Sequence, residues 1–106
     1  MSQMSRYAVY QLPFENPKIR DLSFMSPAEV EEISGDYEVV ATVDARSLSE
    51  AFRIGNFVVE ADSTLIEVLG DMHSISVGDI IHNLVTDETH VVDKIGFMKI
   101  NMKESV

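Results

Sequence analysis

The chain contains no cysteine and no tryptophan. Without thiols it can form neither a disulfide nor a thiolate metal site, which is compatible with a reducing cytoplasm. No apolar run approaches the roughly 20 residues that a membrane-spanning helix needs. The N-terminal stretch "MSQMSRYAVYQ" also lacks the apolar region of a secretory signal. Because 106 residues suit one modest core, we expect a single cytoplasmic domain, residues 1–106, with no membrane association.

Basic residues are also scarce, since eight Lys and Arg stand against eighteen Asp and Glu, for a net charge of −10. The imbalance lies in the body of the chain. From Glu29 to Asp93 there are fifteen acidic residues and two basic ones, a net of −13, whereas the two ends together carry +3. Such a body repels nucleic-acid phosphates and anionic membranes, and it is steered toward basic surfaces. The alternative is that the acidity serves only solubility.

Alternating apolar residues predict several strands. Residues 6–14, "RYAVYQLPF", and 36–43, "DYEVVATV", fit this pattern, and the second predicts Tyr37, Val39, Ala41 and Val43 on one face. Between them "ENPKIRDLS" reads as a polar connection, because its Asn-Pro step disfavours a helix. The C-terminal segments "DIIHNLV", "THVVDKI" and "FMKINM" predict a β-meander whose first link is "TDE". Residues 57–70 stay undecided, since "STLIEV" suits a strand or a helical turn.

Two short helices carry recognisable start signals. Ser26 precedes Pro27 and stands three residues before Glu29, which is the spacing of a capping box. Ser47 repeats this spacing with Glu50. Gly35 is expected to end the first helix, and Gly55 or Asn56 the second with a left-handed residue. With the strands, this pattern predicts an α+β domain with a mostly antiparallel sheet.

The densest polar pattern is "MHSISVGDII", residues 72–81. Gly78 tolerates positive φ, and Asp79 bonds readily to nearby backbone N–H groups. The stretch matches neither a nucleophile elbow nor a phosphate-binding loop. It therefore predicts a turn at Gly78 and Asp79 that starts a strand, with a catalytic loop as the alternative.

The histidines are the only candidates for a metal site. With a three-residue link centred on Asp87, His82 lies opposite Val92, and His82 and His90 become diagonal neighbours on one face. A two-residue link would instead send them to opposite faces. A third ligand such as His73 or Asp93 is still needed, and nothing in the spacing brings either close. We predict no metal and no cofactor.

Three stretches together resemble the YodL-like group of small proteins, encoded largely by bacteriophages, plasmids and other mobile elements. They are "YAVYQLPFENPKIRDLSFMS", "YEVVATVDARSLSEAFRIGNF" and "MHSISVGDIIHNLVTDETHVVDKIGFMKI", so the resemblance spans residues 7–100. It implies an accessory protein in a bacterial cytoplasm. It supplies no catalytic residues, because such proteins are mostly uncharacterised.

The acidic body and the resemblance together predict a non-enzymatic accessory protein that binds a basic surface of a host protein. Anti-defence activity or host takeover would suit it, with mimicry of nucleic acid as one form, and we expect no direct nucleic-acid binding. The residues predicted to contact the partner are Glu29, Glu31, Glu32, Asp36 and Glu38.

Two alternatives belong to other classes. A small hydrolase would use His73, Asp79 and His90, and it requires these side chains to converge in a pocket. A self-associating structural protein would pair an exposed edge strand, such as residues 7–12 or 97–102, into a homodimer.

Overall fold

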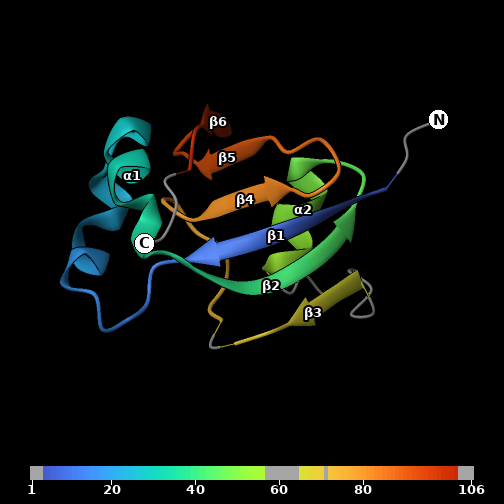
Figure 1. Ribbon diagram of the computed structural model, residues 1–106, viewed down its shortest axis with the longest axis horizontal. Helices are drawn as coiled ribbons and strands as arrows, with labels where there is room; N and C mark the ends of the chain where they lie inside the picture. The colour runs from blue at the N-terminus through green and yellow to red at the C-terminus, as the bar shows by residue number, and fades with distance from the viewer. Residues whose placement is uncertain (1–3, 57–64, 71, 103–106) are drawn as a thin grey trace.

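Among the residues that the structure describes, the fold is one six-stranded antiparallel sheet with helices on both faces (Figure 1). The computed structural model describes residues 4–56, 65–70 and 72–102. The strand order is β3-β2-β1-β4-β5-β6, so the predicted α+β class with a C-terminal meander is confirmed. The strands are β1 Ser5–Gln11, β2 Glu38–Ala45, β3 Ile66–Val68, β4 Ile80–Asn83, β5 Thr89–Val92 and β6 Phe97–Ile100, and the helices are η1 Pro17–Phe24, α1 Pro27–Ile33, η2 Ser34–Asp36 and α2 Leu48–Gly55.

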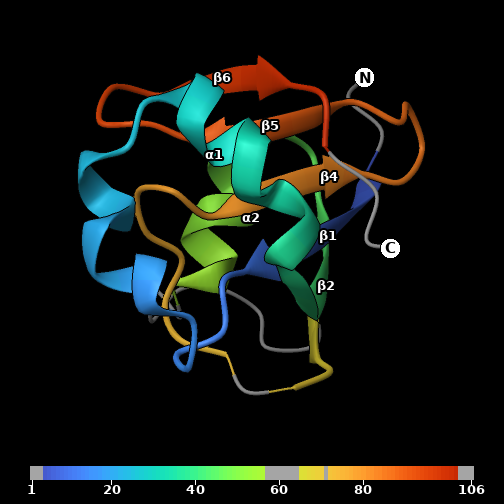
Figure 2. The ribbon, with the colours of Figure 1, turned by 60° about the vertical axis from the view of Figure 1, so that its left-hand side comes forward.

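The two faces of the sheet carry separate apolar clusters. Helix α2 covers one face, where Ala51 and Ile54 pack with Val9 and Ile81. Helices η1 and α1 cover the other face, where Leu22 and Val30 pack with Leu12, Ile80, Val91 and Ile100. Figure 2 shows α1 in front of the strands and α2 behind them. Strand β1 lies between β2 and β4, so the expectation that residues 7–12 form an exposed edge is wrong. Strand β6 is an edge, as predicted.

A β-bulge interrupts the expected alternation in β2. Val9 pairs with Ala41, but Tyr10 pairs with Val39, so Val40 has no partner opposite it. Ala41 and Val43 are fully buried as predicted, whereas Val39 is 43% exposed and Val40 is buried. The prediction that Val39 shares their face is therefore wrong, because the extra residue reverses the alternation.

Two local predictions in the first connection also differ from the structure. The segment expected to be irregular contains the 3₁₀ helix η1, which begins after Asn16, whose side-chain oxygen accepts from Lys18 N at 3.0 Å. Pro17 stands at the first helical position, where its missing N–H costs nothing. Gly35 does not end α1, because α1 stops at Ile33 and Gly35 lies within the 3₁₀ helix η2 that follows directly.

The predicted helix caps are confirmed. Ser26 Oγ accepts from Glu29 N at 3.3 Å, and Ser47 Oγ accepts from Glu50 N at 3.1 Å. The left-handed stop of α2 is wrong, since Asn56 has φ −93° and Gly55 has no positive φ. Gly55 has another role, because a side-chain carbon there would overlap Ile75. A glycine at this point lets the 72–79 segment pack against the end of α2.

The β4–β5 hairpin has a longer link and another register than predicted. The strands stop at Asn83 and resume at Thr89. His82 pairs with Thr89, and Ile81 pairs with His90, so the two histidines point to opposite faces. The difference arises at Asn83, whose side-chain oxygen accepts from the N–H groups of Val85 and Thr86 and so closes a wider turn.

Residues 66–68 form a strand paired with β2, which decides part of the region left open by the sequence; residues 57–64 lie outside the described residues. In the described part of the chain, no helix has the length and apolar character needed to cross a lipid bilayer.

Candidate functional site

The segment Met72–Asp79 forms an ordered turn before β4, as the sequence predicts. Gly78 has φ +96°. Asp79 Oδ2 accepts from Ser76 N at 2.9 Å, and Asp79 N donates to Ser76 O at 3.0 Å. The Tyr37 hydroxyl donates to Gly78 O at 2.6 Å. Gly78 and Asp79 are therefore structural turn residues, and strand β4 begins immediately after them.

Gln11, at the end of β1, fastens this segment to the sheet. Its Nε2 donates to His73 O at 2.8 Å and to Asp79 Oδ2 at 3.1 Å, and its Oε1 accepts from His73 N at 3.2 Å. The side chain is 2% exposed. Sequence reasoning missed Gln11, although one signal was present. It occupies the inward position that follows Tyr7 and Val9 in the alternation, where a polar side chain must find buried partners.

Asp79 is fully buried, and its carboxylate is only half satisfied. Oδ2 accepts two hydrogen bonds, but Oδ1 has no partner among the described residues. Burial raises the pKa of this carboxyl to about 6, against the opposing effects of the Ser76 N–H, His73 and Gln11. Burial also raises the pKa of the neighbouring Tyr37 hydroxyl. Both groups therefore stay protonated and uncharged up to a higher pH than the same groups free in water.

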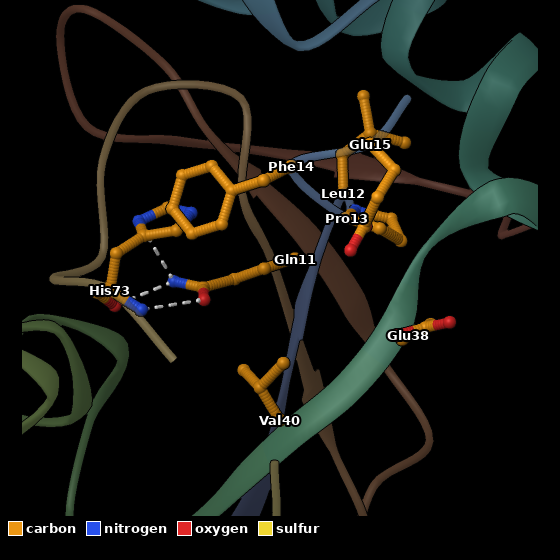
Figure 3. Close-up of a pocket in the computed structure, with 8 residues that line it drawn as sticks. All are labelled: Gln11, Leu12, Pro13, Phe14, Glu15, Glu38, Val40 and His73. Atoms are coloured by element: carbon orange, nitrogen blue, oxygen red, sulfur yellow. Dashed lines mark hydrogen bonds between the residues drawn. The ribbon is translucent and has the colours of Figure 1, made fainter. Parts of the chain in front are cut away.

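A small pocket of about 70 Å³ opens beside Gln11 (Figure 3). In the figure, Phe14 and His73 lie on one side and Glu15 and Glu38 on the other. The rings of Phe14 and His73 have centroids 5.2 Å apart and are tilted by 52°. The lining residues are Gln11, Leu12, Pro13, Phe14, Glu15, Glu38, Val40 and His73.

The His73 ring has a defined hydrogen-bonding state in this site. Its Nδ1 lies 2.8 Å from Ser74 O. A carbonyl oxygen can only accept, so we assign the proton to Nδ1. Nε2 is then the acceptor of the neutral imidazole. With the proton on Nδ1, the 3.4 Å contact between Gln11 Nε2 and Nδ1, dashed in Figure 3, brings two donors together, so we assign the hydrogen bonds of Gln11 to the His73 backbone instead.

The five predicted partner-binding acids follow one another along α1, η2 and the start of β2, but they are not equivalent. Glu29 Oε1 accepts from Ser26 N at 3.2 Å and so completes the capping box. Glu31 Oε1 accepts from Asn101 N at 2.6 Å and ties α1 to the end of β6. Glu32, Asp36 and Glu38 are exposed, and no ion-pair partner faces them within the described residues. These three acids are free to contact another molecule.

Two exposed aromatic side chains lie in the connection that precedes these acids in the chain. Phe14 is 64% exposed and lines the same pocket as Glu38. Phe24 is 79% exposed and stands two residues before Ser26, the cap of α1. Composition alone did not single out either residue. Both stand in the connection between β1 and α1, whose surface position only the tertiary structure reveals.

The residues of the hydrolase alternative are not gathered in this pocket. His73 lines it, whereas Asp79 is buried and does not line it. His90 lies on β5, paired with Ile81 and Lys99. In the 4–56, 65–70 and 72–102 ranges, no three His, Asp or Glu side chains come together in a group that could hold a metal ion.

His82 takes part in a different arrangement, which sequence reasoning missed. Its Nδ1 lies 2.6 Å from Thr89 Oγ1, and its Nε2 lies 3.0 Å from Asp87 Oδ1. The three residues line a broad groove of about 350 Å³ with Tyr10 and Lys99. Asp87 is 91% exposed in the hairpin turn and has φ +66°. The arrangement fastens the hairpin turn to the two strands that it joins.

Comparisons of the chain with protein-family models, with curated proteins and with solved structures give no match. The resemblance to YodL-like proteins therefore stays a prediction.

Proposed function

We propose that this protein is a non-enzymatic binding module whose acidic segment, residues Glu29 to Glu38, docks on a basic surface of another protein. If the resemblance to proteins of mobile elements holds, the partner is a host protein in a bacterial cytoplasm. Under the same condition, anti-defence activity or host takeover is the role that such docking serves.

The observation that carries this proposal is the ten-residue segment from Glu29 to Glu38, the acidic segment, which holds five acids and no base. Four of its carboxylates are exposed and without an ion-pair partner within the described residues, and only that of Glu29 is engaged in a helix cap. A surface of one sign attracts a surface of the other and accelerates the encounter of the two proteins.

The exposed aromatic side chains favour docking over mere solubility. An exposed apolar ring adds nothing to solubility, whereas one that lines a pocket with a carboxylate, as Phe14 does with Glu38, supplies contact area for a partner. Phe14 and Phe24 both turn most of their surface to solvent. Interfaces between proteins are enriched in aromatic residues at their centre and polar residues at their rim.

The test is a matched pair of charge reversals measured on a purified partner. The protein would be used as bait in a bacterial lysate, and the captured partner would be purified for kinetic measurements. One variant, Glu32→Lys/Asp36→Lys, alters the acidic segment. The control, Glu67→Lys/Glu88→Lys, changes the net charge by the same amount at exposed positions on β3 and the β4–β5 turn, and it also removes the exposed ion pair of Glu88 with Lys99.

We expect the variant in the acidic segment to lower the association rate constant about tenfold or more at low salt, and the control to change it little. The difference should shrink as salt is added, because salt screens exposed charges. Equal effects of both variants would contradict the proposal, as would the failure to capture any partner.

A further inference from the structure

We propose that the pocket beside Gln11 binds the guanidinium group of an arginine side chain on the partner. The inference rests on the proposed function for the source of that arginine. It names the contact that would make binding by the acidic segment specific.

The size of the pocket selects a side-chain head group. Its volume of about 70 Å³ is too small for a cofactor or metabolite, whose sites usually occupy roughly 300–1,000 Å³. It is larger than the space one water molecule needs, which is about 10–15 Å³ on the same measure. Leu12, Pro13 and Val40 supply apolar walls for the methylene groups of a long side chain.

The charge of the pocket selects a cation. Glu15 and Glu38 are exposed carboxylates in its lining, which contains no lysine or arginine among the described residues. Neither carboxylate has an ion-pair partner in the part of the chain that the structure describes. A cation that binds at either carboxylate therefore displaces no internal ion pair of the described residues.

The aromatic wall distinguishes arginine from lysine. Phe14 is 64% exposed and is held against His73 with the ring centroids 5.2 Å apart. A planar guanidinium can stack on such a ring and at the same time donate two hydrogen bonds to a carboxylate. An ammonium group has no plane to stack and acts as a point charge.

The pocket is held in shape before any partner arrives. Asn16 N donates to Pro13 O at 3.0 Å, which closes a turn with Phe14 and Glu15 at its tip. The bulge at Val40 sets Glu38 directly opposite Gln11 in the strand register. Gln11 is fixed by its hydrogen bonds to His73 and Asp79. Little ordering of the site is then needed on binding.

The experiment titrates the full chain with the peptide acetyl-Gly-Arg-Gly-amide and follows backbone amide resonances by NMR. Matched peptides carry lysine or citrulline in place of arginine. We expect the arginine peptide to shift the resonances of Phe14, Glu38 and His73, and the other two peptides to bind more weakly. Equal binding of the citrulline peptide would overturn the charge argument. Equal binding of the lysine peptide would overturn the assignment to arginine.

Two substitutions test the pocket itself. Phe14→Leu keeps an apolar side chain but removes the ring, and it should weaken the arginine peptide about 2- to 5-fold. Glu38→Gln should weaken it by a similar factor of about 2- to 5-fold, as for an exposed ion pair. Glu67→Gln, an exposed acid on β3, is the control and should leave the affinity unchanged. Both test positions are exposed, so melting temperatures should stay constant. Unchanged binding of the arginine peptide by both variants would refute the proposal that this pocket binds arginine.

The same variants separate this inference from the proposed function. One outcome is that reversal of Glu32 and Asp36 weakens binding to the purified partner while Phe14→Leu and Glu38→Gln leave it unchanged. In that case the acidic segment binds the partner and the pocket proposal is wrong. If the arginine peptide binds as expected but the partner ignores the charge reversals, the pocket stands and the proposed function is wrong.

Discussion

Replacement of Asp79 by asparagine should change the free energy of unfolding more favourably at neutral pH than at acid pH. Burial raises the pKa of Asp79 from 3.8 to about 6, so the folded protein binds this proton more tightly than the unfolded chain does. The stabilisation from protonation is fully present below pH 3.8 and is lost as the pH rises through about 6. Above that, the buried charge costs about 3 kcal/mol, because one pKa unit corresponds to about 1.4 kcal/mol.

The cost of burying the new amide group does not affect this comparison. In the Asp79→Asn variant the side chain keeps an oxygen that can accept from Ser76 N and Gln11 Nε2, and its NH₂ group replaces Oδ1, which has no partner among the described residues. An unsatisfied buried NH₂ costs about 1–3 kcal/mol, but this cost is the same at every pH. It therefore cancels when the effect of the substitution is compared between two pH values.

Urea denaturation of both proteins at pH 3.5 and pH 7.5 measures this double difference. We expect Asp79→Asn to be more favourable at pH 7.5 than at pH 3.5 by about 2–3 kcal/mol. An equal effect of the substitution at both pH values would refute the reasoning, because it would mean that the carboxyl titrates alike in the folded and unfolded chain.

Two further predictions concern the backbone. Gly78→Val should lower the free energy of unfolding by more than about 1 kcal/mol, because φ is +96° and a side chain would meet Leu22; Gly70→Ala, with open space around it, should be close to neutral in the same urea titration. Ser26→Ala and Ser47→Ala should each cost about 1 kcal/mol through loss of the cap. Ser49→Ala, at an exposed position inside α2, should cost far less, and an equal loss would argue against the capping explanation.

Some of the site was predictable because its signals are local. The caps at Ser26 and Ser47 each depend on a hydrogen bond to the residue three positions later, and the turn at Gly78 depends on one residue's freedom of φ. The exposure of Glu32 and Glu38 also follows from the local apolar pattern, which turns their neighbours inward.

What the sequence by itself determined is the class of the fold, the starts of its helices, the Gly78–Asp79 turn and the excess of acid. The tertiary structure alone decided the pocket, because Gln11 meets His73 and Asp79 across 62 and 68 residues of chain. It also decided the faces of β2 and of the hairpin. One extra residue at Val40 and two hydrogen bonds to Asn83 shift the strand registers, and with a side-chain period of two such shifts reverse which side chains lie inside.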